Sequence, residues 1–239
     1  MLSHPLSAPL STPLAGIKAV IFDFDGVLVD SEPISLGELQ NSFEEFGIHM
    51  EWSALVKGFL GTAPRDITRF MKEKTGRDPE GVFPEGWNRR VLARIEKGLT
   101  MIAGAKELLD ELDRRAIPYC LASGSSPDRL LLSLTKIGQE KRFEGRSFST
   151  EMVPNGKPAP DIFLYAAEKL KIDPKDCMVV EDGIAGTIGA KAAGIGRIVG
   201  LVGGSHLSDA ELRALHAKAL TEAGSNMIVQ TLDALVTQD

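Results

Sequence analysis

Residues 19–30, AVIFDFDGVLVD, decide the fold of this chain. The stretch begins with a run of β-forming residues and continues directly into two aspartates, Asp23 and Asp25. Burying carboxylates at the end of an apolar strand costs free energy unless a cation compensates their charge. The stretch therefore predicts a buried strand that ends at a site able to hold a cation.

On the C-terminal side of this stretch, apolar β-type runs alternate with helical patterns. The candidate strands lie at 18–23, 117–122, 146–150, 177–181 and 197–202. The helical patterns between them, with apolar residues at three- and four-residue spacing, lie at 103–116, 126–138, 159–172 and 183–195. This alternation predicts an α/β fold with a doubly wound, Rossmann-like parallel sheet covered by helices on both faces.

One interval interrupts the alternation. Residues 31–100 contain amphipathic helical pieces but no clear strand, and the interval is too long for an ordinary connection. We interpret residues 32–100 as a helical cap domain inserted above the end of the first strand. The α/β core would then comprise residues 16–31 and 101–239, and the Pro- and Ser-rich residues 1–15 would form a loose tail.

The composition is that of an ordinary globular chain of 239 residues with a formal net charge of −6. The absence of a basic stripe argues against nucleic acid as a partner, and no apolar run is long enough for a membrane span. Cys120 and Cys177, the only cysteines, lie in apolar runs, which indicates buried thiols in a reducing cytoplasm. His4, His49, His206 and His216 form no ligand-spaced cluster, and we expect them at the surface.

Reactive side chains follow four of the candidate strands at their carboxyl ends, where open parallel sheets bind ligands. They are Asp23 and Asp25 after the first strand, Ser123 and Gly124 at the second, Lys157 after the third, and Glu181 and Asp182 at the fourth. Because these ends share one edge of the sheet, we expect the residues to lie together.

This set suits the binding of a phosphoryl group. Asp23, Asp25 and Asp182 offer hard oxygen ligands of the kind that Mg²⁺ prefers beside a substrate phosphate. The Ser123 hydroxyl, the Lys157 ammonium and backbone N–H groups just after Ser123, near a helix start, can hold phosphate oxygens. With no cysteine or histidine nucleophile at hand, a carboxylate would attack phosphorus, and Asp25 would be free for proton transfer.

Four motifs carry a resemblance to a known family. The segments DFDGVLVDSE, ASGSS, KPAPDIF and VVEDGIAG resemble the four motifs of the haloacid dehalogenase superfamily. The likeness is greatest to the branch with a helical cap after the first motif, which includes sugar-phosphate phosphatases and β-phosphoglucomutase. The resemblance covers about residues 18–203.

The resemblance implies a role for each motif residue. Asp23 would be the nucleophile and a Mg²⁺ ligand, and Asp25 the general acid and base, ligating the metal through its backbone carbonyl. Asp182 would be the third protein ligand of the metal. Ser123 and Lys157 would bind phosphate. Glu181 would fix the metal site without binding the ion directly.

In the cap, the segment FLGTAPRDI at 59–67 resembles a family loop that faces the active site. We therefore take Gly61 and Arg65 as candidates for contact with the substrate. Two positions depart from β-phosphoglucomutase: Ser35 stands where that enzyme has a histidine, and Leu60 where it has a lysine.

The sequence therefore predicts a Mg²⁺-dependent phosphatase that hydrolyses a small phosphorylated metabolite, a sugar or polyol phosphate, through an aspartyl-phosphate intermediate. We expect a cytoplasmic monomer or weak homo-oligomer. A phosphosugar mutase is the first alternative. The second, from another class, is a phospho-acceptor signalling module of the receiver type, which would not turn over; the placement of Asp25 beside Asp23 and the cap insertion argue against it.

Overall fold

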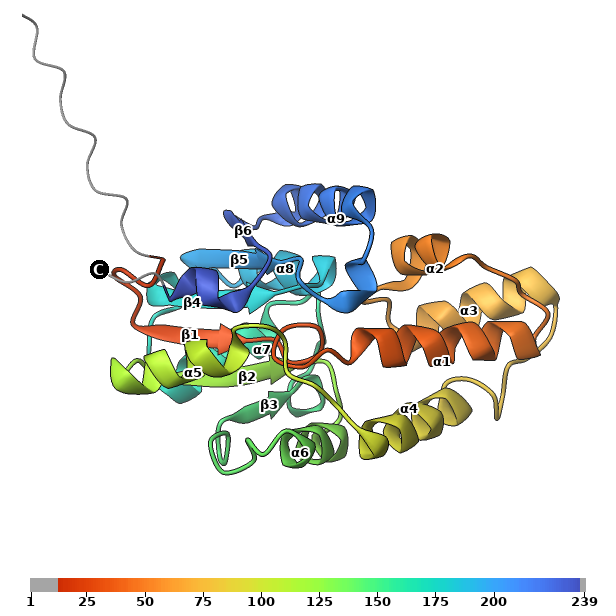
Figure 1. Cartoon of the computed structure of the whole chain (residues 1–239), viewed down its shortest axis with the longest axis horizontal. Coiled ribbons are helices and arrows are strands. Elements are labelled where there is room, and N and C mark those ends of the chain that lie inside the picture. The colour runs from red at the N-terminus through yellow and green to blue at the C-terminus, as the bar shows by residue number, and fades with distance from the viewer. Residues whose placement is uncertain (1–12, 237–239) are drawn as a thin grey trace, which may run out of the picture.

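The computed structural model describes residues 13–236, and within them the strands form one parallel sheet at the centre of an α/β core (Figure 1). The strands are β1 (Ala19–Phe22), β2 (Tyr119–Ser123), β3 (Ser147–Ser149), β4 (Cys177–Glu181), β5 (Arg197–Leu201) and β6 (Met227–Val229), in the order β3-β2-β1-β4-β5-β6. The chain leaves β1 toward β2 and later returns to its other side at β4. The carboxyl end of β1 is therefore the switch point at which such sheets bind ligands.

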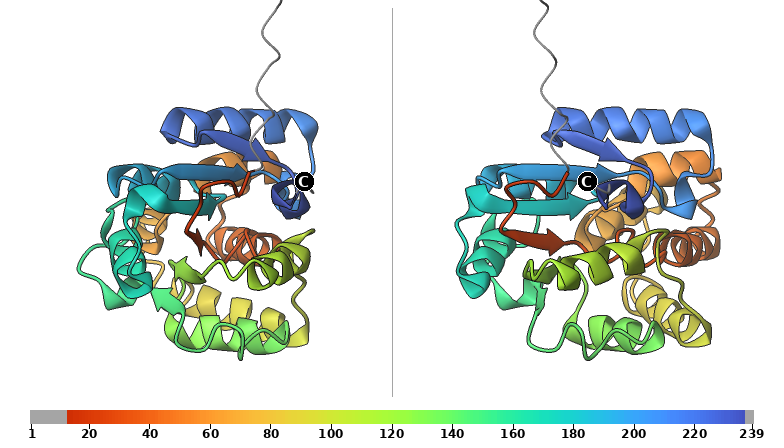
Figure 2. Two further views of the ribbon diagram at one scale, coloured as in Figure 1. Left: turned by 90° about the vertical axis from the view of Figure 1, so that its left-hand side faces the viewer. Right: turned by 60° about the vertical axis from the view of Figure 1, so that its left-hand side comes forward.

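Helices cover both faces of this sheet, as the two rotated views show (Figure 2). Val20 and Phe22 of β1 belong to the apolar cluster that includes α5 (Ala105–Arg114) and α6 (Pro127–Lys136). Ala19 and Ile21 belong to the cluster on the other face, with α7 (Asp161–Leu170) and α8 (Ile184–Ala192). Because successive side chains of a strand point to opposite faces, a strand covered on both sides must be apolar throughout. The prediction of a doubly wound parallel sheet is confirmed.

The long interval after β1 folds into four helices that lie beyond the carboxyl ends of the strands (Figure 1). They are α1 (Glu32–Glu45), α2 (Trp52–Phe59), α3 (Pro64–Thr75) and α4 (Glu85–Lys97). We refer to these helices and their connecting loops as the cap. Its interior is partly aromatic, with the ring of Phe59 5.0 Å from that of Phe43 and 4.9 Å from that of Phe70.

The two chain segments that join the cap to the core pair with each other. The Asp30 amide donates to the Thr100 carbonyl at 2.9 Å, and the Ile102 amide donates to the Leu28 carbonyl at 3.0 Å. The cap also touches the core elsewhere, because the Trp52 indole N–H of α2 donates to the His206 carbonyl at 3.3 Å. These contacts fix the cap directly above the end of β1.

The structure adds elements near the C-terminus that the sequence patterns did not predict. The helix α9 (Ala210–Ala223) buries only Leu212 and Leu220, so its apolar periodicity is weak, and β6 has three residues. At the other end, Leu14 is 4% exposed and packs in the core, which therefore begins before residue 16. The remainder of the predicted tail, residues 1–12, lies outside the described residues.

Cys120 and Cys177 are free and buried, as predicted. No helix in the part of the chain that the structure describes is long and apolar enough to cross a bilayer. The prediction of surface histidines is wrong for His206, which is 1% exposed, and for His216, which is half-buried, whereas His49 is exposed. His4 lies outside the described residues.

The burial of His206 predicts a specific pH dependence of stability. Burial and the neighbouring His216 lower the pKa of His206 from 6.5 to about 4. Between these values the unfolded chain takes up a proton that the folded protein refuses, so the free energy of unfolding falls as the pH falls from 6.5 toward 4. On this basis the wild type should lose about 2 kcal/mol more than a His206→Leu variant between pH 7 and pH 5, as measured by denaturant unfolding.

The exposed His49 provides the matched control. A His49→Leu variant, which removes an exposed histidine in place of a buried one, should keep the pH dependence of the wild type. Identical pH dependence of the wild type and His206→Leu would show that His206 does not remain neutral in the folded protein.

Candidate active site

Asp23, the first residue after β1, is held at the switch point by its backbone and by a cation. Its amide donates to the Val180 carbonyl at 2.9 Å, which continues the β1–β4 pairing past the strand. Its carboxylate accepts from the Lys157 ammonium at 2.8 Å. Burial and the nearby Glu181 carboxylate nevertheless raise the pKa of Asp23 from 3.8 to about 7, against the opposing effect of Lys157.

Lys157 lies between two carboxylates. It reaches from the loop before α7 to Asp23, and it also forms a short ion pair with Glu181 at the end of β4. Burial alone would lower the pKa of Lys157, but the two carboxylates raise it above its ordinary value. The ammonium is therefore a permanent positive charge next to the Asp23 carboxylate.

The acids at this edge fit the site of a divalent cation. Oxygens of Asp23, Glu181 and Asp182 all lie within 4.8 Å of one another. The Asp182 carboxylate forms no ion pair with any described residue, and burial followed by the charges of Glu32 and Asp23 raises its pKa well above 3.8. Hard oxygen ligands with uncompensated charge are what Mg²⁺ requires, so the residues fit the predicted metal. Asp23 and Glu181 both accept from Lys157, and Glu181 also accepts from the Gly183 amide at 3.0 Å, which makes it the most fully engaged of the three acids.

Gly26 allows the Asp182 carboxylate to approach the loop after β1. Gly26 has φ +74, and a Cβ atom built there would lie 1.9 Å from Asp182 Oδ2. No residue with a side chain fits at this position without displacing the carboxylate. A glycine here therefore permits the clustering of Asp23 and Asp182.

Asp25 has different partners from Asp23. The Ser31 and Ser125 hydroxyls each donate to its carboxylate at 2.5 Å, and the Arg129 guanidinium donates at 2.7 Å. Burial alone would raise the pKa of Asp25, but Arg129 and the two hydroxyls hold it below 3.8. These partners therefore favour the ionised form of Asp25.

Two of the three predicted phosphate-binding residues line the cavity, and the third does not. Lys157 and Gly124 line the cavity above Asp23. Ser123 is buried at the end of β2, where its hydroxyl accepts from the Ser125 amide at 3.0 Å, and it is not part of the cavity wall. In this arrangement Ser123 shapes the loop, and its predicted contact with phosphate stays a prediction.

A cavity of about 560 Å³ separates the acids from the cap. Gly61 lines it, with φ +69 in the loop after α2. Arg65 does not: its side chain is 86% exposed and lies 3.8 Å from Asp66. The structure therefore brings the α2–α3 loop to the site but not the predicted arginine.

The structure adds three residues that sequence reasoning missed. Arg129, the third residue of α6, pairs with Asp25 and also donates to the Ser35 hydroxyl at 3.1 Å. Glu32, at the start of α1, lines the cavity, and burial and the charge of Asp25 raise its pKa from 4.5 to about 7. His216 of α9 binds the Asp182 backbone carbonyl through Nε2 at 2.6 Å. Both Arg129 and Glu32 stand near a helix start, where a charged residue is usually solvated, so no local pattern distinguishes them.

Comparison with known proteins agrees with this geometry. Residues 17–194 match the family model of the haloacid dehalogenase-like hydrolases. The chain is 30% identical to the phosphorylated carbohydrates phosphatase of Thermotoga maritima, over 92% of this chain and 97% of the relative. It is 29% identical to the 6-phosphogluconate phosphatase of Escherichia coli, over 76% of this chain and 81% of the relative.

A solved structure extends the agreement to three dimensions. A haloacid dehalogenase-like protein of unknown function from Agrobacterium tumefaciens superimposes with a TM-score of 0.81 at 31% identity, covering 92% of this chain and 96% of that one. The family match, together with the phosphatase names of the relatives, supports the predicted phosphoric monoester hydrolase. The chain belongs to the haloacid dehalogenase-like hydrolases.

Proposed function

We propose that this protein hydrolyses the phosphate monoester of a small sugar or polyol with Mg²⁺ as cofactor, and that the Asp23 carboxylate is the nucleophile. The observation that carries the proposal is the position of Asp23. It lies at the switch point of the sheet, beside the Lys157 ammonium, in an acidic cluster that opens into the cavity under the cap. The names of the relatives cited above support a phosphorylated carbohydrate as substrate.

In the first step, a carboxylate oxygen of Asp23 attacks phosphorus. An O–P bond forms to Asp23 while the bond from phosphorus to the ester oxygen breaks, and the leaving oxygen takes a proton from the Asp25 carboxyl group. Lys157 offsets the charge on the phosphoryl oxygens, and Asp25 must enter this step protonated. Its hydroxyl partners, Ser31 and Ser125, can re-orient to accept a hydrogen bond from the protonated form.

In the second step, water attacks the phosphorus of the aspartyl-phosphate. Asp25 accepts a proton from the water, the bond between phosphorus and Asp23 breaks, and inorganic phosphate leaves with the Asp23 carboxylate restored. The lowered pKa of Asp25, caused by Arg129 and the Ser125 and Ser31 hydroxyls, favours the ionised form that this step requires. Confinement under the cap limits access of bulk water to the acyl-phosphate.

The predicted metal ligands are Asp23, Asp182 and the backbone carbonyl of Asp25. When bound, Mg²⁺ supplies positive charge that offsets the carboxylates and the phosphoryl oxygens. His216 and Gly26 hold Asp182 in place, the first through its carbonyl and the second by leaving room for its carboxylate. The receiver-type alternative has no support in the family match, which is to hydrolases.

Removal of the metal tests the cofactor assignment. Treatment with EDTA should abolish turnover of sorbitol 6-phosphate and of p-nitrophenyl phosphate, and Mg²⁺ should restore it, with release of phosphate as the measurement. An Asp182→Asn variant should need at least about tenfold more Mg²⁺ for half-maximal rate, because one anionic ligand is lost.

The exposed acid Glu80 in the cap offers the matched control. A Glu80→Gln variant should keep the Mg²⁺ requirement of the wild type. Full activity in EDTA, or an unchanged Mg²⁺ requirement in Asp182→Asn, would contradict the proposed metal site.

A further inference from the structure

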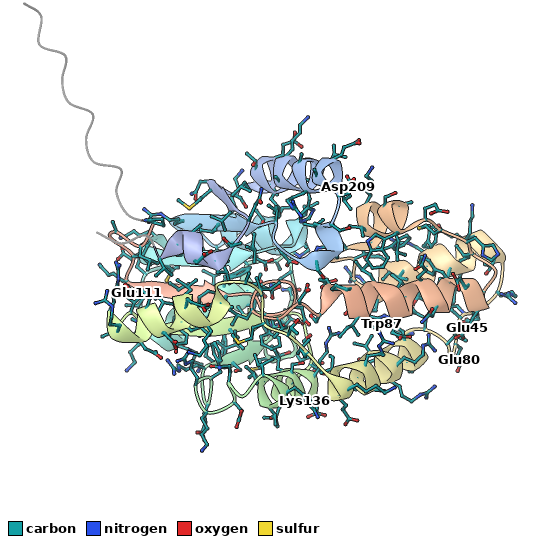
Figure 3. All side chains as sticks on the ribbon, viewed as in Figure 1. Glu45, Glu80, Trp87, Glu111, Lys136 and Asp209 are labelled. Carbon is teal, nitrogen blue, oxygen red and sulfur yellow. The ribbon has the colours of Figure 1, made fainter. Side chains whose placement is uncertain are left out.

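The wall of the cavity that faces away from Asp23 comes from the cap and is largely apolar. The apolar side chains of this part of the wall include Leu36, Leu39, Phe59, Leu60, Ile67 and Trp87, and the uncharged polar side chains of Thr62 and Asn88 also line the cavity. Trp87, labelled in Figure 3, extends from α4 toward α1, and its indole N–H donates to the Ser35 carbonyl at 2.9 Å. Because the only polar atom of the Trp87 side chain is already hydrogen-bonded to the protein, the ring can offer the cavity only apolar surface.

Away from the end of the cavity that would bind the phosphoryl group, the charged side chains that line the cavity are acidic. Among the described residues, the cationic side chains that line it are Lys157 and Arg129. Lys157 is paired with Asp23 and Glu181, and Arg129 is paired with Asp25. Both cations therefore serve the phosphoryl end of the site.

The cap and its first linker contribute acids to the cavity and no base. Glu32 and Glu85 line it, from the starts of α1 and α4. The basic residues of α2 and α3 lie elsewhere: Lys57 is exposed and outside the wall, Arg65 is solvent-exposed, and Arg69 pairs with Asp66 at 2.8 Å. Above pH 7, where Glu32 is ionised, an anionic group on the leaving part of a substrate would meet the carboxylates of Glu32 and Glu85 and, among the described residues of the wall, no unpaired cation.

We infer that the cap selects esters whose leaving group is uncharged, a hydroxylated carbon chain with an apolar side, and rejects esters with a second anionic group. The apolar wall accommodates the carbon skeleton, and the carboxylates of Glu32 and Glu85 accept hydrogen bonds from hydroxyls. Glu32 and Glu85 also repel a carboxylate or a second phosphate. This inference rests on the proposed phosphatase function and names its substrate class.

The inference separates this chain from the relative named for 6-phosphogluconate, whose substrate carries a carboxylate. It also argues against mutase action, because a phosphosugar mutase must hold a second phosphate, and the cap offers that group no cation. Leu60 stands at the position where the sequence comparison with β-phosphoglucomutase places a lysine, and here it forms part of the apolar wall.

The test compares two esters that differ in one group. Sorbitol 6-phosphate and 6-phosphogluconate share the same carbon skeleton, but the first ends in an alcohol and the second in a carboxylate. Measured at pH 9, above the pKa of about 7 that Glu32 has in the folded protein, the enzyme should prefer sorbitol 6-phosphate by about 100-fold in kcat/KM, the scale of repulsion between carboxylates roughly 6 Å apart at an effective dielectric of about 20. Glycerol 3-phosphate and 3-phosphoglycerate form a second matched pair.

A variant that places a cation in the apolar wall tests whether the absence of a cation there causes the rejection of anionic leaving groups. Leu60→Lys should shift the preference toward 6-phosphogluconate by at least about tenfold, because an ammonium there would pair with the carboxylate. The matched control Leu60→Met keeps the apolar character and should leave the ratio near that of the wild type. Glu32→Gln should narrow the ratio as well, since it removes a repelling charge.

Each outcome decides. Equal kcat/KM for the two members of a pair, or preference for the anionic member, would overturn the inference. Turnover of p-nitrophenyl phosphate without turnover of any polyol ester would also overturn it. Loss of turnover for every ester would instead refute the phosphatase function itself.

Discussion

Asp23→Ala is expected to reduce kcat for every phosphate ester by about 10⁴-fold or more, the scale seen when a covalent nucleophile is removed. Among the described residues, the acids near Asp23 have other partners or another proposed role, which for Asp182 is to hold the metal. Asp25 is held by Arg129 and two hydroxyls, and Glu181 is held by Lys157. Alanine is the preferred substitution, because it removes both carboxylate oxygens and leaves no side-chain group that can attack phosphorus.

Two measurements accompany this experiment. The first is acid quenching with radiolabelled ester, which should trap phosphate on the wild type and none on Asp23→Ala. The second is denaturant unfolding, which shows whether the variant is folded. Asp173→Asn, an acid in an exposed loop, serves as the control and should retain wild-type turnover. A variant without Asp23 that retains activity within tenfold of the wild type would exclude Asp23 as the nucleophile.

Gly186→Ala is expected to lower kcat/KM by about 100-fold although residue 186 carries no functional group, since a displacement of about 1 Å in a catalytic group has this effect. A Cβ atom at Gly186 would lie 1.8 Å from Oε1 of Glu181. Glu181 is 1% exposed and forms the ion pair with Lys157, so it has little room to move. Its displacement would release Lys157 from one of its two carboxylates and shift its ammonium relative to Asp23.

The sign of the change in the free energy of unfolding caused by Gly186→Ala distinguishes a gain in helix propensity from overpacking against Glu181. Alanine in a helix interior is favoured over glycine by about 1 kcal/mol, so helix propensity alone predicts a more stable protein. Overpacking at a buried contact costs about 1–3 kcal/mol, and the loss of the buried Glu181–Lys157 pair adds to that cost. We expect the free energy of unfolding to fall, as measured by denaturant unfolding.

Gly183→Ala is the matched control in the same segment. A Cβ atom at Gly183 would lie 3.4 Å from Glu181 Oε2, and the residue has φ −96 and ψ 140, which alanine adopts readily. Its activity should stay within a few-fold of the wild type. Equal losses in the two variants, or a more stable and fully active Gly186→Ala, would show that the position of Glu181 does not control the site.

Local sequence predicted the sheet and the identity of the acids at its edge. Strands buried on both faces must be apolar along their length, so β1 and β4 stand out from their surroundings, and the carboxylates directly after them are conspicuous. The parallel arrangement then requires that Asp23 and Asp182 share one edge. The same reasoning failed for α9 and β6, because few of their side chains are buried and their patterns are weak.

The partners of the charged side chains were decided only by tertiary structure. Arg129 meets Asp25 across 104 residues of sequence, and Glu32 joins the acidic cluster because α1 begins above the end of β1. Conversely, Arg65 had a favourable sequence position but lies in solvent. Spacing rules describe neighbours within a turn or a strand, whereas the free energy of a buried charge depends on whatever the fold places within a few ångströms of it. Local sequence therefore determined the fold and the reactive groups, and tertiary packing determined their ionisation and the shape and charge of the substrate cavity.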